Sequence, residues 1–153
     1  MAESVIGIIM GSKSDKEIMD RAAAILDELQ IPHDIEVCSA HRNPGRTAEY
    51  AREAEGRGIK VIIAGAGLAA ALPGVLAAHT HLPVIGGPIN AENSLINGMD
   101  AVGGILQMPP GVPVACVGIN NARNAGLLAA AIIALSDAEV KERLIAYRQK
   151  LSQ

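Results

Sequence analysis

The sequence of 153 residues is poor in aromatic side chains: it has no phenylalanine and no tryptophan, and its two tyrosines are Tyr50 and Tyr147. Proteins that bind single strands or RNA stack bases on aromatic rings, so this function class is disfavoured. A positive charge excess is also lacking, because 13 lysines and arginines stand against 16 aspartates and glutamates, with a net charge of -3. We therefore expect no nucleic-acid partner.

Cysteines and long apolar runs are scarce as well. Cys38 and Cys116 form no Cys-x-x-Cys pair, so they predict buried, reduced thiols rather than a disulfide framework. Charges and glycines interrupt every apolar run before the roughly 20 residues that a membrane-spanning helix needs. Near the start, Glu3 stands where a signal peptide would be basic. We expect a soluble protein of the cytoplasm without a membrane partner.

The remaining composition predicts one α/β domain over residues 1–153. Half of the residues are hydrophobic, and no segment has the composition of a linker. Short runs rich in valine and isoleucine alternate with longer alanine-rich segments. The predicted strands are residues 4–10, 34–38, 60–64, 83–86 and 113–118. Nearly continuous apolar strands separated by helices predict a parallel sheet that is covered on both faces.

The intervening segments have the period of helices. From Ile18 to Leu29, apolar residues recur on one face of an amphipathic helix. Further helices are predicted over residues 44–55, 73–79, 100–107, 122–135 and 138–151. In sheets of this kind ligands bind beyond the carboxyl ends of the strands, so the loops that follow the strands are the candidate functional segments.

The first such loop is residues 11–15, with the sequence GSKSD. Its two hydroxyls and the N-terminus of the following helix can donate hydrogen bonds to an anion. Ser14, followed three residues later by Glu17, also fits a capping box, which is a purely structural explanation. That explanation leaves Ser12 and Asp15 unaccounted for.

The second loop is residues 39–44, with the sequence SAHRNP. Asn43 as N-cap and Pro44 as first helical residue predict the helix start, and they leave Ser39, His41 and Arg42 at the end of the strand. A histidine titrates near neutral pH, so His41 can both give and take a proton. Arg42 can bind a phosphate or carboxylate through two parallel hydrogen bonds. This loop predicts a catalytic histidine beside an anion-binding arginine.

The third loop is residues 64–74, and its Gly65-x-Gly67-x-x-Ala70 pattern is a weak match to a dinucleotide-binding fingerprint. No acidic residue stands near 20 positions further on, and Pro73 interrupts the helix that the fingerprint requires. We interpret the glycines as permitting close approach of the backbone to a smaller, flat ligand. A dinucleotide-dependent oxidoreductase remains an alternative hypothesis at this point.

These three blocks occur with Gln107-Met108-Pro109 and residues 124–129 in one collinear order. In that order the chain resembles the N5-carboxyaminoimidazole ribonucleotide mutase family of purine biosynthesis over essentially its whole length. The resemblance implies a flavodoxin-like three-layer αβα sandwich with a central parallel sheet, a homo-octamer, and an enzyme that uses neither metal nor organic cofactor. The implied reaction moves a carboxylate, through CO2, from the exocyclic nitrogen of an aminoimidazole ribonucleotide to a ring carbon.

The resemblance also implies roles for individual residues. Ser12, Asp15 and Arg42 would bind the ribose-phosphate, and His41 would act as both general acid and general base. The further substrate-binding residues that we predict in the three loops are Ser14, Ser39, Ala40, Ala66, Gly67 and Leu72.

Two positions depart from the family pattern. Ala71 stands where bacterial mutases have a histidine, and Gly87 stands where many members have valine. Without an imidazole at position 71, His41 is the one candidate proton carrier in these blocks. Direct carboxylation of aminoimidazole ribonucleotide by CO2 therefore stays open as an alternative, although residues 64–67 favour the mutase. A non-catalytic nucleotide-phosphate sensor is the alternative from a different class.

Overall fold

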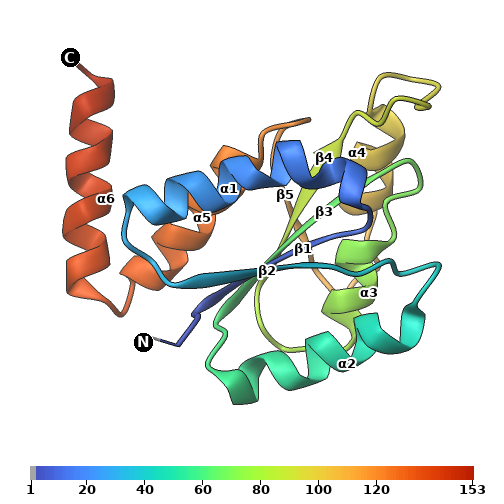
Figure 1. Cartoon of the computed structure of the whole chain (residues 1–153), viewed down its shortest axis with the longest axis horizontal. Helices are drawn as coiled ribbons and strands as arrows, with labels where there is room; N and C mark the ends of the chain where they lie inside the picture. Colours follow the sequence, from blue (N-terminus) through green and yellow to red (C-terminus); the bar gives the residue numbers. More distant parts are fainter. Residues whose placement is uncertain (1–2) are drawn as a thin grey trace.

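The computed structural model describes residues 3–153, which form a five-stranded parallel sheet in the order β2-β1-β3-β4-β5 between two layers of helices (Figure 1). The strands are β1 (Ile6–Met10), β2 (His33–Val37), β3 (Val61–Gly67), β4 (Val84–Ile89) and β5 (Ala115–Cys116). The helices are α1 (Lys16–Glu28), α2 (Pro44–Ala54), α3 (Leu72–Ala78), α4 (Met99–Leu106), α5 (Ala122–Ala134) and α6 (Ala138–Leu151), with short 3-10 turns η1 (Lys13–Asp15) and η2 (Glu55–Arg57). The predicted α/β class and parallel sheet are confirmed.

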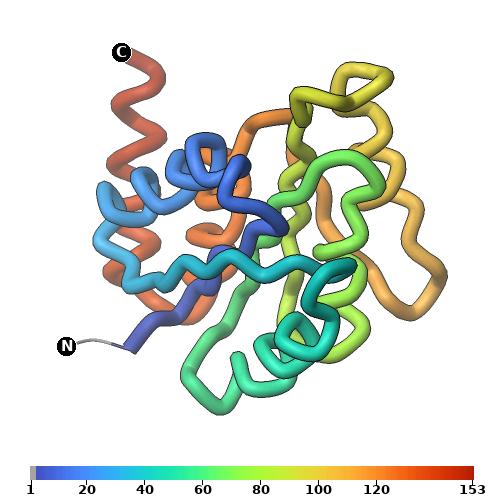
Figure 2. The backbone as a smooth tube through the Cα atoms, turned by 45° about the vertical axis from the view of Figure 1, so that its right-hand side comes forward, coloured from blue at the N-terminus to red at the C-terminus, as the bar shows by residue number. Residues whose placement is uncertain are grey.

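The two faces of the sheet carry separate apolar cores. Ile6, Ile8 and Met10 of β1 point to the face that α1 and α5 cover, whereas Ile9 points to the face of α2, α3 and α4. This alternation follows from the period of two along a strand. Helix α6 packs on α5 at one side of the molecule, away from the sheet (Figures 1 and 2). In the absence of phenylalanine and tryptophan, aliphatic side chains make up most of both cores, and each core holds one of the two tyrosines, Tyr147 on the side of α1 and α5 and Tyr50 on the other.

Small side chains allow α1 and α5 to pack closely. Ala22 of α1 and Ala125, Gly126 and Ala129 of α5 are all buried. A Cβ atom added at Gly126 would lie only 2.5 Å from Cγ2 of Ile25 and 3.2 Å from the Ala22 carbonyl oxygen. Glycine at this position therefore sets the distance between the two helices.

Strands β3 and β4 continue beyond their predicted ends. The predictions end at residues 64 and 86, but the two strands pair with each other as far as Gly67 and Ile89. Pro88 fits within β4 because β5 pairs no further than Gly86 on that side, and the Pro88 carbonyl accepts instead from the Asn120 backbone N–H at 2.9 Å. Strand β5 is correspondingly short, two residues rather than the predicted span of 113–118.

Both cysteines are free thiols. Cys38 is buried and Cys116 is half-buried, so the prediction of buried thiols is confirmed for Cys38 and only in part for Cys116.

Over residues 3–153, the helices are too short or too polar to cross a bilayer.

A pair of glycine substitutions tests the packing of α1 on α5. We expect Gly126→Ala to lower the free energy of unfolding by about 1 kcal/mol, because overpacking against Ile25 outweighs the gain in helix propensity. Gly103, in the middle of α4, is the matched control, because an added Cβ there would meet no atom within 4 Å. Gly103→Ala should raise the free energy of unfolding by about 0.5–1 kcal/mol. Urea denaturation measures both, and a stabilised Gly126→Ala would contradict the close contact.

Candidate active site

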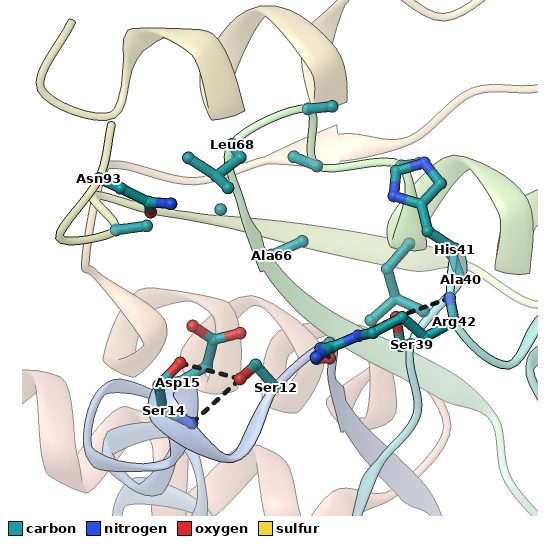
Figure 3. A pocket seen from close by; sticks show the side chains of 17 residues that line it. Ser12, Ser14, Asp15, Ser39, Ala40, His41, Arg42, Ala66, Leu68 and Asn93 are labelled. Atoms are coloured by element: carbon teal, nitrogen blue, oxygen red, sulfur yellow. Dashed lines mark hydrogen bonds between the residues drawn. The ribbon is translucent and has the colours of Figure 1, made fainter. Parts of the chain in front are cut away.

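The carboxyl ends of β1 to β4 surround one cavity of about 570 Å³ (Figure 3). Parallel pairing brings these ends to the same edge, so loops that are distant in sequence meet there. All ten predicted site residues line the cavity: Ser12, Ser14, Asp15, Ser39, Ala40, His41, Arg42, Ala66, Gly67 and Leu72. The structure thus brings the predicted residues together, and their individual roles remain predictions.

The loop after β1 forms a 3-10 turn rather than the predicted capping box. Ser12 Oγ accepts from the Ser14 backbone N–H at 3.3 Å and lies 2.9 Å from Ser14 Oγ. Helix α1 then starts at Lys16, and Asp15 at its N-cap makes no capping hydrogen bond with its side chain. The capping-box prediction is wrong because the inserted turn places Ser14 inside η1. One hydroxyl proton of the serine pair remains for a ligand.

The loop after β2 is tied to the loop after β1 by Arg42. Its Nη2 donates to the Gly11 carbonyl oxygen at 2.8 Å, and its Nε donates to Ser39 Oγ at 3.2 Å. A guanidinium has five N–H donors, so several remain to bind an anion in the cavity. The Asn43 side chain caps α2 by accepting from the Arg46 backbone N–H, which confirms the predicted helix start.

Asp15 places a carboxyl group in the wall of the cavity with only 8% of its surface exposed. Burial raises the pKa of this carboxyl above its usual value, and the Ser12 backbone N–H and the charge of Arg42 offset the rise only in part. A carboxylate accepts hydrogen bonds, so Asp15 suits the hydroxyls of a sugar better than a phosphate.

The loop after β3 forms the apolar wall. Gly67 is the last residue of β3, and a Cβ atom added there would lie 2.9 Å from the Cβ of Ala91. This close approach brings the loop after β4 onto the cavity, where Ala91 and Asn93 line it. The dinucleotide fingerprint is not realised, because Gly65 lies inside β3 and no helix starts before Leu72.

Seven lining residues were not among the predicted site residues. Gly11, Leu68, Ala69, Ala70 and Ala71 belong to loops that were singled out, whereas Ala91 and Asn93 follow a strand whose loop was overlooked. The rule that ligands bind beyond the carboxyl ends of strands applies to β4 as well, and the polar segment at residues 90–94 was the available signal.

His41 is exposed and carries the one imidazole among the lining residues. In Figure 3 its ring lies on the opposite side of the view from Ser12, Ser14 and Asp15. Within residues 3–153, no side chain hydrogen-bonds to this ring. A ring without a protein partner is available to exchange a proton with a bound molecule.

A family model described as AIR carboxylase matches residues 5–153. The chain belongs to the AIR carboxylase family. Members of this family that resemble it include the N5-carboxyaminoimidazole ribonucleotide mutase of Thermotoga maritima, 53% identical over 97% of this chain and 85% of the relative. The mutase of Bacillus subtilis is 52% identical over 99% of this chain and 93% of the relative.

A relative with a different name is also similar. The phosphoribosylaminoimidazole carboxylase of Schizosaccharomyces pombe is 56% identical over 85% of this chain, which corresponds to 23% of that longer protein. Among solved structures, Treponema denticola PurE superposes with a TM-score of 0.86 at 29% identity, over 97% of this chain and 91% of that one. The resemblance seen in the sequence is confirmed, and with it the flavodoxin-like fold of the AIR carboxylase family.

Removal of the buried carboxyl tests the electrostatics of the site. Because the folded-state pKa of Asp15 is raised, its ionisation costs stability as the pH rises past the ordinary value of 3.8. We expect Asp15→Asn to have a higher Tm than the parent protein at pH 7, and the difference to vanish below the ordinary pKa. Differential scanning calorimetry across pH measures this. Glu17→Gln removes an exposed carboxylate two residues away, in the first turn of α1, and should give no such rise.

Proposed function

We propose that this chain is an N5-carboxyaminoimidazole ribonucleotide mutase that forms 4-carboxy-5-aminoimidazole ribonucleotide in purine biosynthesis. The observation that carries the proposal is one cavity lined by an available imidazole, His41, by the anchored guanidinium of Arg42 and by two hydroxyls from the neighbouring loop. Near-complete coverage by relatives that bear the mutase name supports it.

The polar side of the cavity fits a ribose-phosphate. Arg42 and the serine pair Ser12 and Ser14 offer a positive charge and hydroxyl donors to the phosphate. The Asp15 carboxylate accepts from ribose hydroxyls. Ser39 contributes by holding the Arg42 guanidinium in place.

The other side of the cavity fits the imidazole base. Ala40, Ala66, Gly67 and Leu72 line it, so the flat ring meets small side chains and backbone instead of an aromatic partner. Backbone N–H groups of this segment orient the carboxylate in the proposal.

The chemistry requires one proton carrier that works in both directions. Protonated His41 gives its proton to the exocyclic nitrogen while the bond from that nitrogen to the carboxylate carbon breaks, which leaves an amine and CO2. The amine donates electron density into the ring, and the neighbouring ring carbon attacks CO2. Neutral His41 then removes the proton from that carbon, which restores the aromatic ring and the imidazolium. The sum is an isomerisation in which His41 begins and ends in its protonated form.

Retention of CO2 gives the enzyme its advantage. Well-oriented partners held together react as if at effective molarities of about 10⁵ M or more. The CO2 released in the first step must therefore stay beside the ring until the second. A cytosolic location belongs to the proposal, because a phosphorylated nucleotide is confined to the compartment that makes it.

Direct carboxylation of aminoimidazole ribonucleotide is the second candidate function. It is favoured by Ala71, which removes the second imidazole expected of bacterial mutases, and by the similarity to a yeast protein named as a carboxylase. The same cavity would then take CO2 from solution. A nucleotide-phosphate sensor would use the same anion-binding residues without proton transfer.

The proposal is tested by supplying the two substrates side by side. Carboxyaminoimidazole ribonucleotide without bicarbonate should be converted rapidly, and aminoimidazole ribonucleotide with bicarbonate slowly. The reverse preference would establish the carboxylase, and binding without conversion of either would establish the sensor.

Substitution of the proton carrier gives the sharper prediction. We expect His41→Asn to lower kcat by about 10² to 10⁴-fold, while binding of the product nucleotide changes little, because only proton transfer is lost. Steady-state kinetics and isothermal titration calorimetry separate the two effects. His81→Asn, an exposed histidine outside the cavity, is the matched control and should behave as the parent protein. Near-parental kcat in His41→Asn would refute the assigned proton carrier.

We extend the proposal to a homo-octamer. Several large apolar side chains are exposed in the single chain, among them Leu95 at 95% and Leu135 at 87%. Six of them form two groups along the chain, one at the start of α4 and one just after α5 and on α6: Leu95, Ile96 and Met99, and Leu135, Ile145 and Leu151. Exposed apolar groups of this extent mark surfaces that associate, and closed symmetric assemblies are the usual result.

Light scattering tests the assembly. We expect a single species of about eight times the chain mass of 15.8 kDa, because both apolar groups need partners. A monodisperse monomer would refute the octamer and would leave the proposed reaction unaffected, because every residue assigned to the reaction lies in one chain.

A further inference from the structure

Leu68 adopts a backbone conformation that is costly for a leucine. Its φ angle is +54°, in the left-handed region where a Cβ crowds the following carbonyl. Four other non-glycine residues within 3–153 have positive φ: Gln30, Ala70, Asn97 and Asn120. Among these five, Leu68 is the one with a large apolar side chain. Strain of this kind concentrates at functional sites.

The fold fixes the backbone of this loop independently of the leucine side chain. The Ala70 backbone N–H donates to the Gly67 carbonyl oxygen at 2.9 Å, which closes the turn. Helix α4 packs against the same loop so closely that a Cβ atom added at Gly104 would lie 2.4 Å from the Ala69 carbonyl oxygen. Glycine would suit position 68 better than any other residue. The geometry of the turn therefore does not account for the leucine at position 68, and its side chain must serve a purpose in the cavity.

The leucine side chain lines the cavity and is still 39% exposed. Figure 3 shows Leu68 and Asn93 on one side of the pocket, with Ser39, His41 and Arg42 on the other. The neighbouring lining residues Ala66, Ala69 and Ala70 have only methyl groups. Two leucines line the cavity, and Leu72 is buried with 2% of its surface exposed, so Leu68 is the exposed long hydrocarbon side chain of the apolar wall.

We propose that Leu68 covers the apolar side of the cavity and retains CO2 between its release from nitrogen and its capture by carbon. This inference rests on the proposed mutase function. CO2 is small and uncharged, so the anion-binding groups do not hold it, and only a closed apolar wall slows its escape. Because the sequence has no phenylalanine and no tryptophan, a leucine covers the ligand here instead of an aromatic side chain.

Isotope exchange distinguishes retained from escaped CO2. The full-length enzyme converts unlabelled carboxyaminoimidazole ribonucleotide in a buffer that contains ¹³C-bicarbonate, and mass spectrometry gives the labelled fraction of the carboxylated product. A blank without enzyme corrects for spontaneous decarboxylation. The parent enzyme should form largely unlabelled product, because CO2 is captured before it exchanges with solution.

Leu68→Ala should raise the labelled fraction severalfold and release free aminoimidazole ribonucleotide. Its kcat should fall while its KM for the nucleotide stays near the parental value, because the ribose-phosphate contacts are untouched. Leu68→Met keeps a long apolar side chain and should restore low labelling. Ile35→Ala removes an apolar side chain with the same exposed fraction, 39%, from β2 outside the cavity, and should leave labelling unchanged.

The outcomes separate this inference from the function on which it rests. Unlabelled product from Leu68→Ala at parental kcat would overturn the role of Leu68 and leave the mutase intact. Fully labelled product or no product from the parent enzyme would overturn the mutase function and this inference together. If Leu68→Ala fails to fold by circular dichroism, Leu68→Gly decides in its place, because glycine relieves the backbone strain.

Discussion

The parallel pairing of β1 with both of its neighbours is the constraint on which the site depends. Met10, the last residue of β1, is in register with Val37 of β2 and with Gly65 of β3. The three following loops therefore leave the sheet at one edge, and Arg42 reaches from the second loop to the first. A shift of one residue in either pairing would turn the buried side chains of that strand to the other face and separate the loops, so the apolar pattern of the strands protects the site as well as the core.

Much of this arrangement was predictable because each strand carries its own signal. Apolar runs predicted the strands and a parallel sheet, and the edge rule together with the family resemblance then predicted ten residues that line the cavity. The ends of β3 and β4 were not predictable in the same way, because they contain glycine and proline, which disfavour strands locally. The two ends are extended because β3 and β4 pair with each other as far as Gly67 and Ile89. Asn93 was missed although a polar segment at residues 90–94 follows β4, because the approach of that segment to the cavity depends on the close packing of Ala91 against Gly67.

The cavity has a polar wall, formed by the loops after β1 and β2, and an apolar wall, formed by the loops after β3 and β4. The loops after β1 and β2 concentrate charge and hydrogen-bonding groups, and there the expected cost is the ionisation of the buried Asp15 carboxyl, whose pKa burial raises. The loops after β3 and β4 are nearly without charge, and there the cost is backbone strain at Leu68. Both costs lie at the site, while the alternating aliphatic residues of β1 and the close contact of α1 with α5 supply the stability that offsets them.

The anchoring of Arg42 has a thermodynamic consequence. With no ligand bound, its guanidinium is already held by the Gly11 carbonyl and by Ser39. Ordering a long, flexible side chain on binding typically costs about 0.5–1.5 kcal/mol, and here folding has met that cost before the nucleotide arrives. Association should consequently be fast and require little rearrangement, with discrimination among phosphorylated compounds arising from how quickly each one leaves.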